Sequence, residues 1–133
     1  MQVITPENML KHFAEAFNSG DIDALLSLYE SEATMVVSSS ARVVKGISAI
    51  RSALEEFLML RGEIVLELIY CIQTAELALL QAKWRLTGTS PDGQSVSMEG
   101  NSVEVYRRQS DGRWLYIIDN PFGAQIVSNE GCQ

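Results

Sequence analysis

In the first half of the chain, hydrophobic residues recur with the spacing of amphipathic helices. One helix is predicted between Thr5, a suitable N-cap, and Gly20, because glycine readily adopts the left-handed conformation that often ends a helix. A shorter helix is predicted to start at Asp21, and a third to run from Gly46 to Gly62. Their apolar stripes are Leu10, Phe13, Ala14 and Phe17; Ile22, Leu25, Leu26 and Tyr29; and Ile47, Ile50, Leu54, Phe57 and Leu58.

After Gly62 the hydrophobic period changes from 3.6 to 2, which is the period of a β-strand. Four long strands are predicted, with turns at 74–76, 90–93 and 110–112, and two short strand candidates lie earlier, at 33–37 and 42–45. Helices followed by an antiparallel meander indicate an α+β fold in which three N-terminal helices cover one face of a curved sheet. Residues 1–133 contain no linker-like segment and are expected to form a single domain.

One strand carries an irregular pattern between Met98 and Val103, where the apolar positions change from even to odd numbers. An inserted residue would explain this change, so we predict a β-bulge at Gly100. Such a bulge would either turn Glu99 or Asn101 towards the interior or only curve the sheet around the helices.

Segments 64–72 and 114–118 are apolar at positions of both parities. In a lone antiparallel sheet one face contacts water and is expected to be polar. We therefore expect the helices to cover one face of the sheet and a second copy of the chain to cover the other, in a symmetric homodimer.

Charge and composition narrow the possible partners. Seventeen acidic residues against ten basic ones give a net charge of -7, which has the wrong sign for nucleic acid binding. No apolar run is long enough for a membrane span and no leader is evident, so a soluble, cytoplasmic protein is expected. The two cysteines and the single histidine, His12, show no metal-ligand spacing, so neither a disulfide framework, a metal nor a cofactor is expected.

Segments near both ends of the chain carry a family resemblance. They read FAEAFNSGD at 13–21, LLSLY at 25–29 and VEVYRRQSDGRWLYIIDNPFG at 103–123. Together they resemble the nuclear-transport-factor-2-like (NTF2-like) superfamily, in particular its SnoaL-like and ketosteroid-isomerase-like members. The resemblance implies a cone-shaped, cystatin-like α+β fold with an apolar pocket between the helices and the concave sheet, usually in a dimer.

Ketosteroid isomerase itself uses an aspartate base together with a tyrosine and a protonated aspartic acid that hold the oxyanion. Alignment on the shared Asn-Ser-Gly-Asp segment puts the tyrosine on Phe13, the base on Val37 and the second oxyanion donor on or near Asn101. Phe13 has no hydroxyl group and Val37 cannot accept a proton, so steroid isomerisation by that mechanism is not expected.

The candidate site combines an apolar pocket with a few polar anchors. Asp119, at the end of the last strand, is a candidate general acid or base; alternatively, its carboxylate bonds to backbone N–H groups in an Asx turn. Of the strand carboxylates Glu67, Glu99 and Glu104, at least one is expected to face the interior, and Glu99, which the bulge would turn inwards, is the second catalytic candidate. Arg107 and Arg108 are expected on the rim, where one could pair with Glu104 of a neighbouring strand or subunit. The predicted pocket is lined by Phe13, Phe17, Tyr29, Val37, Leu54, Trp84 and Met98, with Asn101 or Asp119 as polar anchors.

Three functions remain open on the sequence alone. The first is a binding protein for a small apolar or amphipathic molecule, without catalysis. The second is a cofactor-free isomerase, cyclase, dehydratase or hydrolase that uses Asp119 or Glu99, and the third is a non-catalytic dimerisation module with a filled core. A cavity of a few hundred cubic ångströms that a carboxylate faces would favour the enzyme, and the same cavity without one would favour simple binding.

Overall fold

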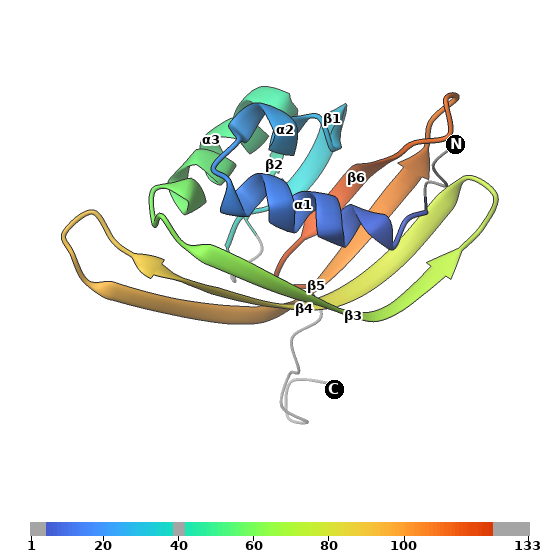
Figure 1. Ribbon diagram of the computed structural model, residues 1–133. Helices are drawn as coiled ribbons and strands as arrows, with labels where there is room; N and C mark the ends of the chain where they lie inside the picture. Colours follow the sequence, from blue (N-terminus) through green and yellow to red (C-terminus); the bar gives the residue numbers. More distant parts are fainter. Residues whose placement is uncertain (1–4, 39–41, 124–133) are drawn as a thin grey trace, which may run out of the picture.

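The computed structural model describes residues 5–38 and 42–123, which form one curved sheet with helices on one side (Figure 1). The helices are α1 (Asn8–Asn18), α2 (Ile22–Leu26) and α3 (Ile47–Leu58). The strands are β1 (Tyr29–Val36), β2 (Val43–Lys45), β3 (Glu63–Gln73), β4 (Leu77–Thr89), β5 (Ser95–Arg108) and β6 (Trp114–Asn120). The order of helices and strands along the chain agrees with the sequence prediction.

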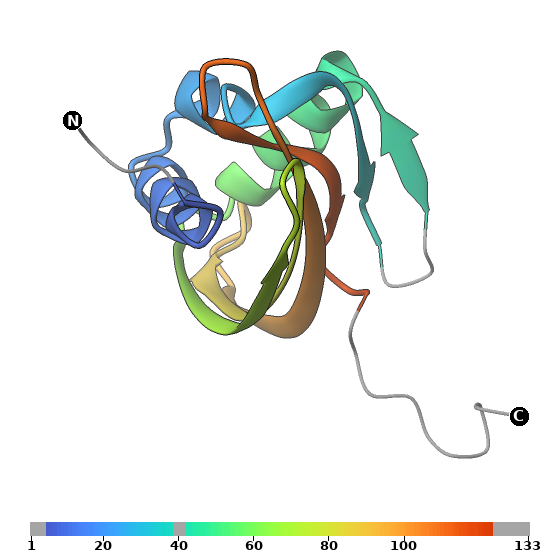
Figure 2. The ribbon, with the colours of Figure 1, turned by 90° about the vertical axis from the view of Figure 1, so that its right-hand side faces the viewer.

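The strands lie side by side in the order β2-β1-β6-β5-β4-β3. Neighbouring strands are antiparallel, except that β1 and β6 run parallel. The long strands β3, β4 and β5 bend so strongly that the sheet curves around the helices (Figure 2). The predicted α+β cone, with three N-terminal helices on a curved and mainly antiparallel sheet, is confirmed.

Local sequence signals explain where the second and third helices begin. Asp21 is the N-cap of α2, and its side chain accepts a hydrogen bond from the backbone N–H of Ala24 at 3.0 Å. Gly20 and Gly46 have positive φ angles of 71° and 92°, which glycine adopts without steric penalty. These two glycines therefore let the chain change direction before α2 and α3.

Tyr29 is not the last residue of the second helix's apolar stripe, contrary to the sequence prediction. Helix α2 ends at Leu26, and Tyr29 is the first residue of β1. The chain leaves the helix here because it pairs with β6: the backbone N–H of Tyr116 donates to the carbonyl oxygen of Leu28 at 2.8 Å. Pairing between distant strands, which a local pattern does not report, decides the place of Tyr29.

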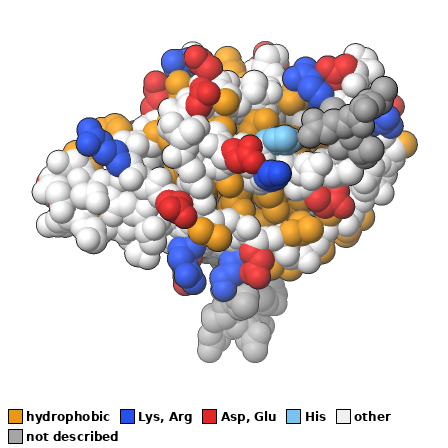
Figure 3. Space-filling view, in the orientation of Figure 1, with side chains coloured by type: hydrophobic (Ala, Val, Ile, Leu, Met, Phe, Trp, Pro, Cys, Tyr) orange, Lys and Arg blue, Asp and Glu red, His pale blue; other side chains and the backbone are white. Residues whose placement is uncertain are grey.

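The hydrophobic core lies between the helices and the concave face of the sheet. Every second residue of β4 from Ala78 to Leu86 is buried, as the period of 2 predicts. Figure 3 shows hydrophobic side chains gathered beneath α1, over the long strands. Core side chains from the helices are Met9, Leu10, Ala16, Phe17, Leu25, Ile50 and Leu54.

The β-bulge that the sequence predicts at Gly100 is absent from the β4–β5 pair. The register between these strands is continuous along their whole length, and Gly100 lies directly opposite Trp84. The even-numbered residues of β5 keep facing the interior throughout, and two of them, Ser102 and Glu104, are polar. The apolar pattern therefore changes parity because polar side chains occupy the interior face, not because a residue is inserted.

Gly100 instead permits a close approach of an aromatic ring. A Cβ atom at this position would lie 2.8 Å from the Nε1 atom of Trp84, closer than van der Waals contact allows. The Trp84 indole rests against this part of β5 and donates a hydrogen bond from Nε1 to the carbonyl oxygen of Pro121 at 2.7 Å. This contact ties the middle of β4 to the residues that follow β6.

Candidate functional site

A cavity of about 60 Å³ lies between α1, α3 and the concave face of the sheet. Its walls are mostly apolar, and one region of them is polar. The aromatic residues around it are Phe13, Phe17, Phe57, Trp84 and Tyr116; the aliphatic ones are Leu10, Leu54, Ile64, Leu66 and Leu86; Ser102, Glu104, Asp119 and Pro121 complete the walls.

Two carboxyl groups lie side by side at the polar end. Glu104 of β5 and Asp119 of β6 are directly opposite each other in the antiparallel pair, so their side chains leave the same face with Cβ atoms about 5 Å apart. Their exposed fractions are only 5% and 6%. They are the only charged residues among the described side chains that line the cavity.

Each carboxyl group has one hydroxyl partner. The Tyr29 hydroxyl donates a hydrogen bond to Asp119 Oδ2 at 2.6 Å, and the Tyr29 ring stacks on Tyr116 with centroids 4.6 Å apart. The Ser102 hydroxyl donates to Glu104 Oε1 at 2.7 Å. The other oxygen of Glu104, Oε2, is buried and has no hydrogen-bond partner in residues 5–38 and 42–123.

Burial gives the two carboxyl groups different acidities. Desolvation raises the pKa of Asp119 to about 6, although the hydrogen bond from Tyr29 opposes this rise. Desolvation and the negative charge of Asp119 raise the pKa of Glu104 well above its ordinary value, against the hydrogen bond from Ser102. At neutral pH Asp119 is therefore mostly ionised, and its charge together with burial favours the protonated form of Glu104.

Five of the side chains predicted for the pocket or its anchors line the cavity: Phe13, Phe17, Leu54, Trp84 and Asp119. Tyr29 lies behind Asp119 and reaches the site through its hydroxyl group. Val37 and Met98 are half-buried and pack against the core without lining this cavity.

Glu99 and Asn101 face away from the cavity, because they occupy the odd-numbered positions of β5. The Glu99 carboxylate is 3.8 Å from the Arg85 guanidinium group, and both side chains are mostly exposed. Asn101 lies opposite the exposed Lys83 on the same outer face. The inward turn expected for these residues depended on the bulge, which the β4–β5 register contradicts.

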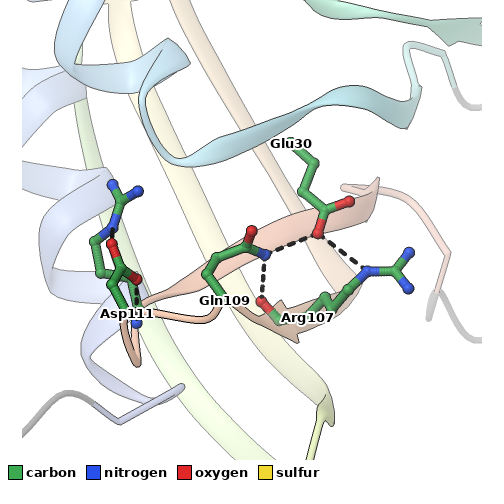
Figure 4. Close-up of polar contacts among 5 residues, drawn as sticks. Glu30, Arg107, Gln109 and Asp111 are labelled. Carbon is green, nitrogen blue, oxygen red and sulfur yellow. Dashed lines mark hydrogen bonds and ion pairs between the residues drawn. The ribbon is translucent and has the colours of Figure 1, made fainter.

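Glu104, and not Glu99, is the strand carboxylate that faces the interior. It is buried in the cavity wall and does not pair with Arg107 or Arg108. Arg107 contacts Glu30 at 3.0 Å, and Gln109 donates to the same carboxylate oxygen at 2.8 Å (Figure 4). Counting in twos along β5 from Met98 would have placed Glu104 on the interior face.

The Asx turn that the sequence analysis considered for Asp119 is formed by the next residue, Asn120. Asn120 Oδ1 accepts a hydrogen bond from the backbone N–H of Phe122 at 3.2 Å. The Asp119 side chain points to Tyr29 instead. Asp119 is therefore free of the turn and faces the cavity.

The described residues include no group of three His, Cys, Asp or Glu side chains arranged to bind a metal ion. The helices in residues 5–38 and 42–123 are all too short or too polar to cross a membrane.

The carboxyl pair predicts a specific pH dependence of stability. Because the folded state holds the Asp119 proton up to about pH 6 and an unfolded aspartate releases it near pH 3.9, folding binds protons in this window. The free energy of unfolding is therefore expected to fall as pH rises from 4 to 7, by roughly 3 kcal/mol from Asp119, and Glu104, whose pKa is raised in the same direction, adds to the fall.

Urea unfolding between pH 4 and pH 8 measures this dependence. The double variant Asp119→Asn/Glu104→Gln is expected to lose most of the decline, whereas Glu99→Gln, which changes an exposed carboxylate, retains it. A wild-type profile as flat as that of the double variant would show that the two carboxyl groups are not destabilised by burial.

Comparison with known proteins identifies a family and several solved structures that share this fold. A family model for the SnoaL-like domain matches residues 10–117. A search of curated proteins finds no match. A ketosteroid isomerase-like protein from Erwinia carotovora atroseptica SCRI1043 superposes with a TM-score of 0.76 at 18% identity, covering 86% of this chain and 89% of that one.

Two further solved structures share the fold at similarly low identity. A conserved protein from Planctomyces limnophilus DSM 3776 has a TM-score of 0.78 at 16% identity, covering 87% of this chain and 91% of its own. An NTF-2 like protein of unknown function from Shewanella oneidensis MR-1 has a TM-score of 0.71 at 19% identity, with coverage of 86% and 93%. Because the family model matches most of its length, the chain belongs to the SnoaL-like family, and its fold is that of NTF2-like proteins.

Proposed function

We propose that this protein binds a small, largely apolar molecule in the cavity, with Asp119 and Glu104 contacting the polar group of that molecule. The observation that carries the proposal is the presence of two buried carboxyl groups in an otherwise apolar cavity. Burial of such groups costs stability, and this cost is typical of binding and catalytic sites. A filled core, as a pure dimerisation module would have, does not need them.

The cavity volume limits the size of the ligand. The cavity of about 60 Å³ is smaller than the few hundred cubic ångströms expected from the sequence, and it holds only a few water molecules. A ligand of more than a few heavy atoms therefore needs rotation of wall side chains such as Phe13 and Phe57, which are only half-buried. The size supports a compact molecule with one polar group.

Thermal shift measurements with a panel of compact alcohols, ketones, amines and carboxylates test this function. At a concentration 100-fold above Kd, binding adds about 2.7 kcal/mol to the stability of the folded state, so at least one compound is expected to raise Tm by several degrees. Leu66→Trp, which fills the cavity, should abolish the shift.

Val65→Trp places the same ring on an exposed position of the same strand and should retain the shift. Equal shifts in all three proteins would put the binding site elsewhere, and the absence of any shift in the wild type would refute the proposed function.

A second candidate function is cofactor-free proton transfer of the isomerase type. The observation that favours it is the position of Asp119, which Tyr29 orients, beside the buried Glu104, whose pKa is raised well above its ordinary value. Asp119 can accept a proton from the carbon next to a carbonyl group while Glu104 donates one to the carbonyl oxygen, which gives the enol.

Deuterium exchange into butanone in D2O, followed by NMR, measures this proton transfer. The wild-type protein is expected to accelerate exchange at the carbons beside the carbonyl, and Asp119→Asn to reduce the acceleration about 100-fold or more, as removal of a general base does. Glu99→Gln is the matched control and should leave the rate unchanged. Equal rates for wild type and Asp119→Asn would exclude this function for Asp119.

The outer face of the sheet supports the proposal that two copies of the chain form a dimer. Ile72, Leu79, Val105 and Ile118 are opposite one another on successive strands, so they form one apolar row across β3, β4, β5 and β6. Ile72 and Ile118 are 59% and 43% exposed in the single chain. An exposed apolar row of this length is typical of a protein interface.

A second copy of the chain is the expected partner of this face, because both basic and acidic side chains lie beside the apolar row. Arg85 pairs with Glu99, and Lys83 lies opposite Glu67, beside the row on the same face. In a two-fold contact the same patch meets itself, so a patch with balanced charges avoids repulsion.

Light scattering during size-exclusion chromatography tests the dimer. The wild type is expected at twice the mass of the 14.7 kDa chain, because the apolar row is covered in the dimer. Leu79→Lys should give a monomer, whereas Thr87→Lys, also on the outer side of β4 but away from the row, should remain a dimer. A monomeric wild type at micromolar concentration would refute the proposal.

A further inference from the structure

The cavity contains acidic groups without a basic partner. None of its described wall residues is a lysine, an arginine or a histidine. Arg85 of β4 and Arg107 of β5 pair outside the cavity, with Glu99 and Glu30. A buried carboxylate is normally paired with a cation or bonded to several donors, and Asp119 has one hydroxyl donor from Tyr29.

The second acidic group also lacks a partner. Glu104 is 5% exposed and lines the same cavity, and its Oε2 atom has no hydrogen-bond partner within residues 5–38 and 42–123. A group that fills the cavity and serves both residues must therefore reach one oxygen on β5 and another on β6. A cation between the two residues allows both carboxyl groups to ionise, and an ammonium group has enough N–H donors for one oxygen of each, whereas a hydroxyl group has only one donor.

The remaining walls suit an organic cation. Phe13 stacks with Phe17 at a centroid separation of 6.0 Å and meets the edge of Tyr116 at 6.1 Å, and Trp84 lines another part of the cavity. The faces of aromatic rings attract ammonium groups, most strongly where water is excluded. The apolar body of an amine would pack against the same rings.

We propose that the ligand is a small apolar amine, whose protonated nitrogen pairs with Asp119 and donates a second hydrogen bond to Oε2 of Glu104. This inference rests on the proposed binding function and names its ligand class. A neutral ligand leaves the charge of Asp119 without a cation, and a carboxylate ligand is repelled by it. The charge of the ligand is thus the property that the site selects.

Calorimetry at pH 7.5 with two matched sets of probes tests the ligand class. The sets are isobutylamine, isobutanol and isobutyrate, and benzylamine, benzyl alcohol and benzoate, so that only the polar group and its charge change within a set. In at least one set the amine is expected to bind ten or more times as tightly as the alcohol, and the carboxylate not to bind.

Variants separate the site from the acidic surface of the protein. Asp119→Asn should reduce amine affinity at least ten times more than it reduces alcohol affinity, while Glu99→Gln, which removes an exposed charge of the same sign, should change neither. Glu104→Gln should weaken the amine by a smaller factor. Circular dichroism checks that each variant is folded, and Glu104→Gln serves alone if Asp119→Asn does not fold.

The outcomes distinguish a failure of the amine assignment from a failure of the proposed binding function. If an alcohol binds as tightly as its matched amine, the amine assignment is wrong and the binding function stands. If amines bind equally well to wild type and to the folded cavity variants, they bind the surface and the assignment is again wrong. If no probe of either set binds, the amine assignment fails, and a panel without any thermal shift refutes the binding function as well.

Discussion

The burial of two neighbouring carboxyl groups is the constraint on which the rest of this site depends. Glu104 and Asp119 occupy opposite positions on adjacent strands and share one small cavity, so the ionisation of one opposes the ionisation of the other. Each receives a single hydroxyl hydrogen bond, which is less than a buried carboxylate needs. The fold tolerates this cost because the surrounding apolar core contributes the stability.

Three contacts join the strands and the chain segment around the two carboxyl groups. The parallel pairing of β1 with β6 brings the hydroxyl of Tyr29 to Asp119, although ninety positions separate them in the chain. The Trp84 indole, seated against Gly100, binds the carbonyl of Pro121 just after β6. The ion pair between Glu30 and Arg107 joins β1 to β5, the two strands on either side of β6. Both carboxyl groups therefore lie on paired strands and not on loops.

The local features of the fold were predictable because they depend on neighbouring residues. The helix that Asp21 caps, the helix after Gly46 and the three hairpin turns all lie where their sequence signals indicate. The bulge at Gly100 was wrong because an interior strand position was assumed to be apolar, whereas β5 places Ser102 and Glu104 there. A polar residue at an interior strand position gives the same sequence pattern as an exposed residue, and the local pattern therefore does not reveal that Glu104 faces the interior.

The sequence by itself determined the family, the α+β class, the apolar walls contributed by Phe13, Phe17, Leu54 and Trp84, and Asp119 as a candidate. These follow from periodicity and from motifs within single segments. Only the tertiary structure decided that Glu104 stands beside Asp119, that Tyr29 bonds to it, and that Glu99 and Asn101 face outwards. The physical reason is that strand register and strand pairing set which side chains share a face, and both are fixed by contacts between residues far apart in the chain.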